Sequence, residues 1–153
     1  MFRPALTFGL LCGLTAVAAP VPRTTNQDAK LIVGEWTAER WEYEGRSTTP
    51  NEVRHVPRVK VTDTSVTLEL GPLAYPMEFA LAPGKSLAHI DMAYSDGPNK
   101  GKQVLGVYEL TGDMLTLCIA PVGGERPDKL GTKEGEQSVL YVLKRTKKDE
   151  GRR

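Results

Sequence analysis

The stretch AHIDMAYSDGPNKGKQVLGVYELTGDMLTLCIA, residues 88–120, decides the fold of this chain. Apolar and polar residues alternate within three short segments, as at Ile90, Met92 and Tyr94. Gly, Asp, Asn and Pro residues separate these segments, which is typical of a β-meander. The stretch therefore predicts consecutive antiparallel strands.

The same alternation continues on both sides of this stretch. It predicts eight strands at about residues 34–44, 54–62, 65–70, 76–82, 87–94, 103–110, 114–120 and 138–145. No long helical pattern lies between them, so the strands must pair antiparallel through short connections. We therefore expect an all-β, eight-stranded antiparallel up-and-down barrel, because closure removes exposed edges; a two-sheet sandwich is the alternative. A short helical turn over residues 29–33, capped by Asp28, is expected before the first strand.

The first residues have the features of an export signal. Residues 5–18 are uncharged, follow Arg3 and end in the small-x-small pattern of Ala16 and Ala18. The apolar run is shorter than the about 20 residues that a membrane span needs. The sequence predicts export to the periplasm or the extracellular space with cleavage after Ala18, and an uncleaved N-terminal anchor is the alternative.

The rest of the chain has the length of one domain. We expect a signal peptide over residues 1–18, a flexible leader over 19–30, a barrel domain over 31–146 and a charged, disordered tail over 147–153. Removing residues 1–18 takes away Arg3 and no acid, which leaves equal numbers of basic and acidic residues. This balance argues against a nucleic-acid partner, since binding to phosphates needs clustered basic residues.

A Gly-x-Trp motif, Gly34 and Trp36, opens the first expected strand, and Arg145 ends the last one. The motif resembles that of lipocalin-like barrels. That resemblance implies a tryptophan that closes one barrel end, an arginine that lies across the indole, and a glycine that lets the chain bend close to that end. The role implied for these residues is structural.

A wider pattern resembles a family of small exported domains best known from planctomycetes, which are lipocalin-like and have no established activity. The residues that carry the resemblance are Ile90-Asp91, Gly106 to Leu110, Gly112 to Leu115, Cys118 and Arg126-Pro127. The chain departs from the family pattern at Ala82-Pro83, where an acid usually precedes the proline, and at residues 86–89, where the usual proline is missing.

Few residues of this sequence suggest a catalytic, ligand-binding or metal-binding role. Residues 121–137 form the longest connection between expected strands. Asp91 is interpreted as an architectural carboxylate that fixes this long connection, with a binding role as the alternative, and Arg126 is the other charged residue of interest. The pair His89 and Asp91, with His55 and Cys118 elsewhere, invites a zinc hypothesis, but the chain lacks the close Cys/His pairs of structural zinc sites. We expect no metal, no cofactor and no catalytic residue, and we interpret Cys118 as a small buried hydrophobe.

Eight-stranded barrels are just wide enough to hold either their own side chains or one small ligand. The leading hypothesis is a non-enzymatic module that binds a small apolar molecule inside the barrel. Its contacts would be the inward residues Phe79, Ile90, Met92 and Tyr108. The alternative is a filled barrel that acts as a protein interaction or scaffold module in the cell envelope.

Overall fold

The computed structural model describes residues 25–147. The expected signal peptide over 1–18, its cleavage after Ala18, and residues 148–153 of the expected tail lie outside the described part of the chain. Within residues 25–147, no helix has the length and apolar character needed to cross a membrane.

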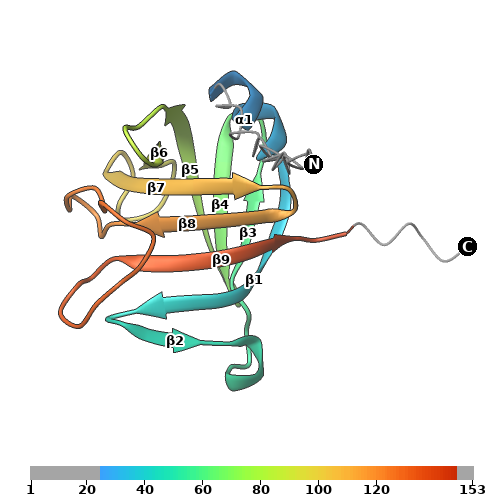
Figure 1. Cartoon of the computed structure of the whole chain (residues 1–153), viewed down its shortest axis with the longest axis vertical. Helices are drawn as coiled ribbons and strands as arrows, with labels where there is room; N and C mark the ends of the chain where they lie inside the picture. The colour runs from blue at the N-terminus through green and yellow to red at the C-terminus, as the bar shows by residue number, and fades with distance from the viewer. Residues whose placement is uncertain (1–24, 148–153) are drawn as a thin grey trace, which may run out of the picture.

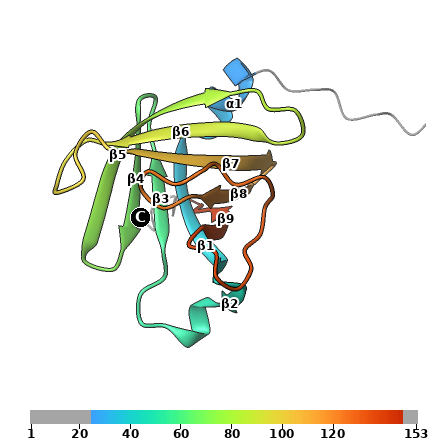
Figure 2. The same ribbon diagram turned by 90° about the vertical axis from the view of Figure 1, so that its left-hand side faces the viewer.

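One helix, α1 (Thr25–Leu31), precedes the strands. The strands are β1 (Gly34–Tyr43), β2 (Arg46–Thr48), β3 (Arg58–Val61), β4 (Ser65–Leu70), β5 (Leu73–Ala82), β6 (Ala88–Tyr94), β7 (Gln103–Thr111), β8 (Met114–Ile119) and β9 (Val139–Arg145), with the 3-10 turn η1 (Pro50–Glu52) between β2 and β3. In both ribbon views α1 and the β2 hairpin lie toward opposite ends of the molecule (Figures 1 and 2).

Eight strands close into an antiparallel barrel in which neighbours in space are neighbours along the chain. β1 closes it by pairing with β3 on one side and with β9 on the other. The β1–β9 pairing runs from Trp36 opposite Arg145 to Tyr43 opposite Val139, with a register shift between Ala38 and Arg40. The expected all-β, eight-stranded up-and-down barrel is confirmed, and its topology is consistent with a lipocalin-like fold.

β2 is an additional strand that the sequence does not predict. It pairs only with the end of β1, and Tyr43 stands opposite Arg46 across the two-residue turn of Glu44 and Gly45. Both turn residues have positive φ, 50° and 74°, as type I′ hairpin turns require. β2 has only three polar residues, too few to show alternation, and the strand expected from residue 54 begins instead at Arg58.

The helix before the barrel begins earlier than expected. Residues 25–30 of the leader are helical, and Asp28 lies within α1 instead of capping a turn over residues 29–33. Asp28 is 8% exposed and accepts a hydrogen bond of 2.8 Å from the Tyr108 hydroxyl. This long-range contact, which no local pattern reveals, ties α1 to the barrel.

A single apolar core fills the inside of the barrel. It is formed by alternate residues of the strands together with Ile32, which follows α1. Its buried members are Ile32, Trp36, Ala38, Val59, Val61, Val66, Met77, Ile90, Met92, Val104, Tyr108, Leu110, Leu115, Leu117, Tyr141 and Leu143. The period-two alternation read from the sequence is therefore the division between the inside and the outside of the barrel.

Candidate functional site

The four residues expected to contact a ligand all face the interior. Phe79 stands opposite Met92 across β5 and β6, and Ile90 stands opposite Gly106, two residues before Tyr108 on β7. Ile90, Met92 and Tyr108 are only 1%, 2% and 1% exposed, whereas Phe79 is partly buried. The chain's own atoms therefore cover three of the four positions.

One end of the barrel is closed by Trp36, which is fully buried. The Arg145 guanidinium lies 4.2 Å from the centroid of the indole, the arrangement that the resemblance implies. Gly34 has a φ of 143°, and a Cβ at this position would lie 2.6 Å from Arg145 Nη1. The positive φ is what favours glycine at this position, and the missing Cβ leaves room for the Arg145 guanidinium over the start of β1. We call this end the closed end.

The closed end also holds the buried pair of Asp28 and Tyr108. Burial, the hydrogen bond to Asp28 and the proximity of its carboxylate all raise the pKa of the Tyr108 hydroxyl above its usual value. The second oxygen, Asp28 Oδ1, is fully buried and has no hydrogen-bond partner among the described residues. The pair is sealed into the protein, so we interpret it as the attachment point of α1.

The opposite end of the barrel, which we call the mouth, is less completely covered. Inward-facing apolar side chains near the mouth pack against the core but are only partly buried. They are Trp41, Val56, Leu68, Tyr94, Ile119 and Val139. These residues therefore leave apolar surface at the mouth that the chain itself does not cover.

Three tyrosines face this mouth from three strands. Tyr75 on β5 and Tyr94 on β6 meet edge to face, with ring centroids 6.5 Å apart and planes at 79°. Tyr141 on β9 stands directly opposite Trp41 on β1. Burial, and then the proximity of Tyr94 and Tyr75, raise the pKa of Tyr141 to about 12. The mouth is therefore lined by aromatic rings that carry hydroxyl groups.

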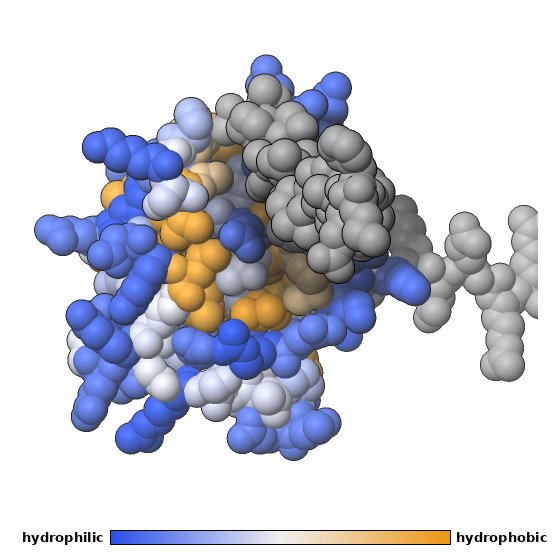
Figure 3. All heavy atoms as spheres, in the orientation of Figure 1, coloured by the Kyte–Doolittle hydropathy of each residue, from blue (hydrophilic) through white to orange (hydrophobic). Residues whose placement is uncertain are grey.

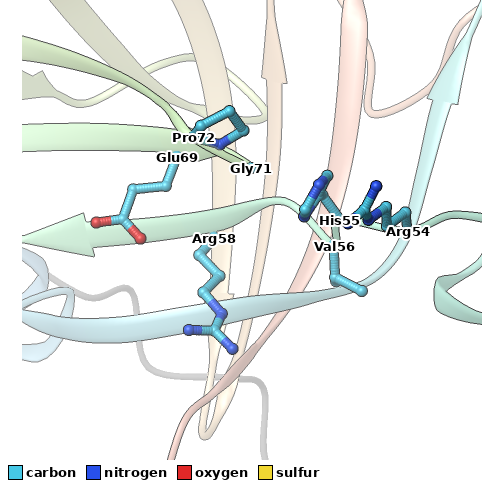
Figure 4. A pocket seen from close by; sticks show the side chains of 7 residues that line it. All are labelled: Arg54, His55, Val56, Arg58, Glu69, Gly71 and Pro72. Atoms are coloured by element: carbon cyan, nitrogen blue, oxygen red, sulfur yellow. The ribbon is translucent and has the colours of Figure 1, made fainter.

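Two hollows flank the mouth. One, of about 220 Å³, is lined by Tyr75, Tyr94 and the loop over residues 96–99. The other, of about 690 Å³, is lined by Arg54, His55, Val56, Arg58, Glu69, Gly71 and Pro72. Figure 4 shows that Arg58 extends away from His55 and Arg54, so these basic side chains do not converge on one point.

The connection between β8 and β9 packs on the outer face of the barrel. Arg126 donates hydrogen bonds to the carbonyl oxygens of Gly106 (2.8 Å) and Ile90 (3.3 Å) and to Asp91 Oδ1 (2.5 Å). The architectural interpretation of Asp91 therefore agrees with the structure, because this carboxylate helps to hold the long connection in place.

Beneath this connection lies a second, small apolar cluster. Val107, Cys118 and Leu140 are buried there, and Leu130 of the connection packs against them. In the orientation of Figure 3, apolar side chains occupy the middle of the face formed by β7, β8 and β9, with hydrophilic ones around them. Burial raises the pKa of the Cys118 thiol. Cys118 thus lies outside the barrel wall and away from the mouth.

The residues of the zinc hypothesis lie apart. His89 and Asp91 are on the outer face of β6, Cys118 is beneath the long connection, and His55 lines the larger hollow at the mouth. Within residues 25–147, no group of three or more His, Cys, Asp or Glu side chains is arranged to hold a metal ion.

The sequence predicted the inward-facing residues in the middle of the barrel and near its closed end, but it did not predict which residues line the mouth. Tyr94 belongs to the same alternating series as Ile90 and Met92, which was the one local signal for it. Tyr75 and Tyr141 are 66 residues apart in the sequence. The antiparallel pairings from β5 to β9 place these two tyrosines at the same end, and the closure of β1 onto β9 makes them face one interior.

Comparison of this chain with protein-family models, with curated proteins and with solved structures finds no match. The functional argument therefore depends on the geometry of the barrel.

Proposed function

We propose that this chain is an exported, non-enzymatic binding module for a small, mostly apolar molecule, and that it belongs with the lipocalin-like planctomycete-type domains that its sequence resembles. The observation that carries the proposal is the uncovered apolar surface at the mouth, where the inward side chains of Trp41, Ile119 and Val139 are only partly buried.

Uncovered apolar surface favours a bound molecule because burial contributes about 25 cal/mol for each Å² removed from water. The ligand would enter at the mouth and rest on the filled part of the core. Met92 lies one inward position deeper than Tyr94 on β6, with Phe79 opposite it, so these two residues would form the floor of the site. Ile90 lies below that floor.

A second function has one observation in its favour. The side chains in the middle and at the closed end already fill the interior, as Ile90, Met92 and Leu143 at 2% exposure or less illustrate. A barrel filled in this way needs no ligand to be stable. It would then act through its surface as a protein interaction or scaffold module of the cell envelope.

A thermal-shift screen distinguishes the two functions. Fatty acids, isoprenoids, sterols and tetrapyrroles are the probes, with native mass spectrometry of the protein as purified. A ligand that binds only the folded state should raise the melting temperature with concentration, by an amount equivalent to about 2.7 kcal/mol at a hundred times its Kd.

The matched variants are Ile119→Gln at the mouth and Val122→Gln on the exposed connection. Ile119→Gln should abolish the shift, and Val122→Gln should preserve it. If no probe stabilises the protein and its mass equals that of the bare chain, the filled interaction module becomes the better function. A shift that persists in a folded Ile119→Gln variant would exclude the mouth as the site.

A further inference from the structure

The smaller hollow beside the mouth combines aromatic rings with one carboxylate. Tyr75 and Tyr94 form two of its walls, and the loop over residues 96–99 completes the lining together with Ala74 and Pro76. The two tyrosine planes stand at 79° to each other, so the rings form a corner and not a parallel stack. With a volume of about 220 Å³, the hollow has room for the end group of a small organic molecule.

Among the described residues that line this hollow, Asp96 is the only charged one. Its Oδ1 accepts a hydrogen bond of 2.8 Å from the backbone N–H of Gly97, which fixes the direction of the carboxylate. No lysine, arginine or histidine side chain in the described part of the chain forms an ion pair with Asp96. Lys100 and Lys102 of the same loop do not line the hollow, and the Lys102 ammonium group lies 3.3 Å from Asn99 Oδ1. The carboxylate of the hollow is therefore without a cationic partner.

Backbone hydrogen bonds hold the walls of the hollow in place. The N–H of Ser95 donates to the carbonyl oxygen of Pro76 (2.9 Å), and the N–H of Gly101 donates to that of Tyr94 (2.8 Å). These bonds attach the loop after β6 to β5 and to β6 itself. A ligand that enters a preformed hollow does not have to order the loop first, so less free energy is lost on binding.

The lining of the hollow restricts the class of ligand. An anion would be repelled by Asp96, and a neutral apolar group would remove the carboxylate from water without giving it a partner, which costs free energy. A calcium or magnesium ion needs about six oxygen ligands, and the hollow offers a single carboxylate. An alkylated ammonium group has a positive charge but needs no hydrogen-bond acceptors, and aromatic rings attract it.

We propose that this hollow binds the alkylated ammonium group of a small organic cation, with its methyl groups against the rings of Tyr75 and Tyr94 and its charge beside Asp96. The rings attract the cation through their quadrupoles, and the carboxylate supplies the counter-charge. The proline rings and Ala74 give the methyl groups further apolar contacts. The site lies beside the mouth and does not depend on the apolar ligand proposed for the interior.

The test compares choline with 3,3-dimethylbutan-1-ol in ligand-observed NMR titrations of the full chain. The two molecules have nearly the same shape, and a neutral carbon in the alcohol replaces the charged nitrogen of choline. We expect choline to bind about tenfold more tightly at low salt, because the rings and the carboxylate attract only the charged molecule. The preference should decrease as the salt concentration rises, since partly exposed charges are screened.

The charge and the rings are tested by separate variants. Asp96→Asn removes the charge and keeps an oxygen that can accept from the Gly97 N–H, and it should reduce the preference for choline about three- to tenfold. The matched control is Asp63→Asn, which removes an exposed carboxylate from the turn between β3 and β4 and should keep the preference. Tyr75→Leu should weaken choline binding about threefold, whereas Tyr75→Phe retains the ring and should not.

Unchanged melting temperatures would establish that the variants are folded. Equal binding of choline and the neutral alcohol, or no binding of choline, would overturn the inference. A preference that persists in Asp96→Asn, or that falls equally in Asp63→Asn, would also overturn it, because the attraction would then not come from this carboxylate.

The proposed function of the interior is distinguished by Ile119→Gln. This variant changes the apolar surface inside the mouth, and Ile119 does not line the hollow. Choline binding should therefore be the same in Ile119→Gln and in the wild type. Loss of choline binding in a folded Ile119→Gln variant would place the cation inside the barrel and would overturn the inference.

Discussion

At the scale of single residues, Trp36 and Arg145 do more than close the barrel. Their side chains donate to three consecutive carbonyl oxygens, of the last residue of α1 and of the two residues after it. Arg145 Nη2 donates to Leu31 (2.5 Å), Trp36 Nε1 to Ile32 (2.9 Å) and Arg145 Nη1 to Val33 (2.9 Å). The last carbonyls of a helix lack partners within the helix, so this pair satisfies groups that would otherwise need water. The same stack therefore covers the core and anchors α1.

Replacing Trp36 by Ala should lower the free energy of unfolding by about 3–5 kcal/mol, as truncation of a large buried aromatic side chain does. The measurement is urea or thermal unfolding. Leu73→Ala, at an exposed position of β5, is the control and should change stability by less than about 0.5 kcal/mol. An unfolding curve of Trp36→Ala that matches wild type would mean that the indole is peripheral to the fold.

Tyr141 makes stability depend on pH in the alkaline range. Its pKa is raised to about 12 from an ordinary value of 10, because burial disfavours the phenolate. The unfolded chain therefore releases this proton first as the pH rises. The stabilisation is fully present below pH 10 and is lost between pH 10 and pH 12.

We accordingly expect the melting temperature to fall above pH 10, and to fall less steeply in Tyr141→Phe. Part of the slope should remain in that variant, since the pKa values of Tyr94 and Tyr108 are raised as well. Melting curves at a series of pH values test this. Identical slopes in the wild type and in Tyr141→Phe would contradict it.

At the scale of elements, the connection between β8 and β9 behaves as a part of the fold, although it contains no strand. Arg126 attaches it to the backbone of β6 and β7, and Leu130 covers Cys118. The ion pair with Asp91 is partly exposed, so its own contribution is small, and the bonds to the carbonyls of Ile90 and Gly106 carry more of the attachment.

The rate at which the Cys118 thiol reacts with a labelling reagent measures how firmly this connection is attached. In a chain with Cys12 replaced by Ser, Arg126→Met should raise the rate at which a thiol reagent labels Cys118 by about five- to thirtyfold, equivalent to losing about 1–2 kcal/mol of protection against local opening. Asp91→Asn should have a smaller effect. Lys133→Met, which breaks an exposed ion pair on the same connection, is the control. Equal labelling rates in all four chains would show that Arg126 does not hold the connection.

At the scale of the whole molecule, the barrel has one closed end and one mouth. Trp36, Arg145 and α1 occupy the closed end, and the aromatic lining faces the mouth. Up-and-down connectivity makes each strand a neighbour of the next, and only the pairing of β1 with β9 joins the two ends of the domain. That long-range pairing defines the interior and therefore the proposed site.

The N-terminal residues yield a prediction about processing. From the uncharged run over residues 5–18 and its Ala-x-Ala ending, we expect export and cleavage after Ala18. N-terminal sequencing of the exported protein should begin at Ala19. A protein that retains Met1, or that begins at a lipid-modified Cys12, would overturn this prediction.

The sequence by itself determined the architecture. Period-two alternation is a local property of a strand, so Ile90, Met92 and Tyr94 could be assigned to one face before any partner strand was known. Local turn residues between the strands, and the absence of a long helical pattern, then implied antiparallel neighbours. The closed end was implied by the resemblance of the Gly-x-Trp motif and Arg145 to lipocalin-like barrels. The three polar residues of β2 are too few to alternate, so this strand could not be found.

The tertiary structure alone decided which interior positions are filled and which are open. Period-two alternation places Phe79 and Tyr108 inside the barrel. The space left around each of these side chains depends on the side chains that the strands across the barrel direct toward it. Asp28 meets Tyr108 across 80 residues of sequence, and Tyr141 faces the same interior as Tyr75 and Tyr94 because the pairing of β9 with β1 closes the barrel. Distances across a closed barrel are set by its register and closure, and those depend on pairings between residues far apart in the chain.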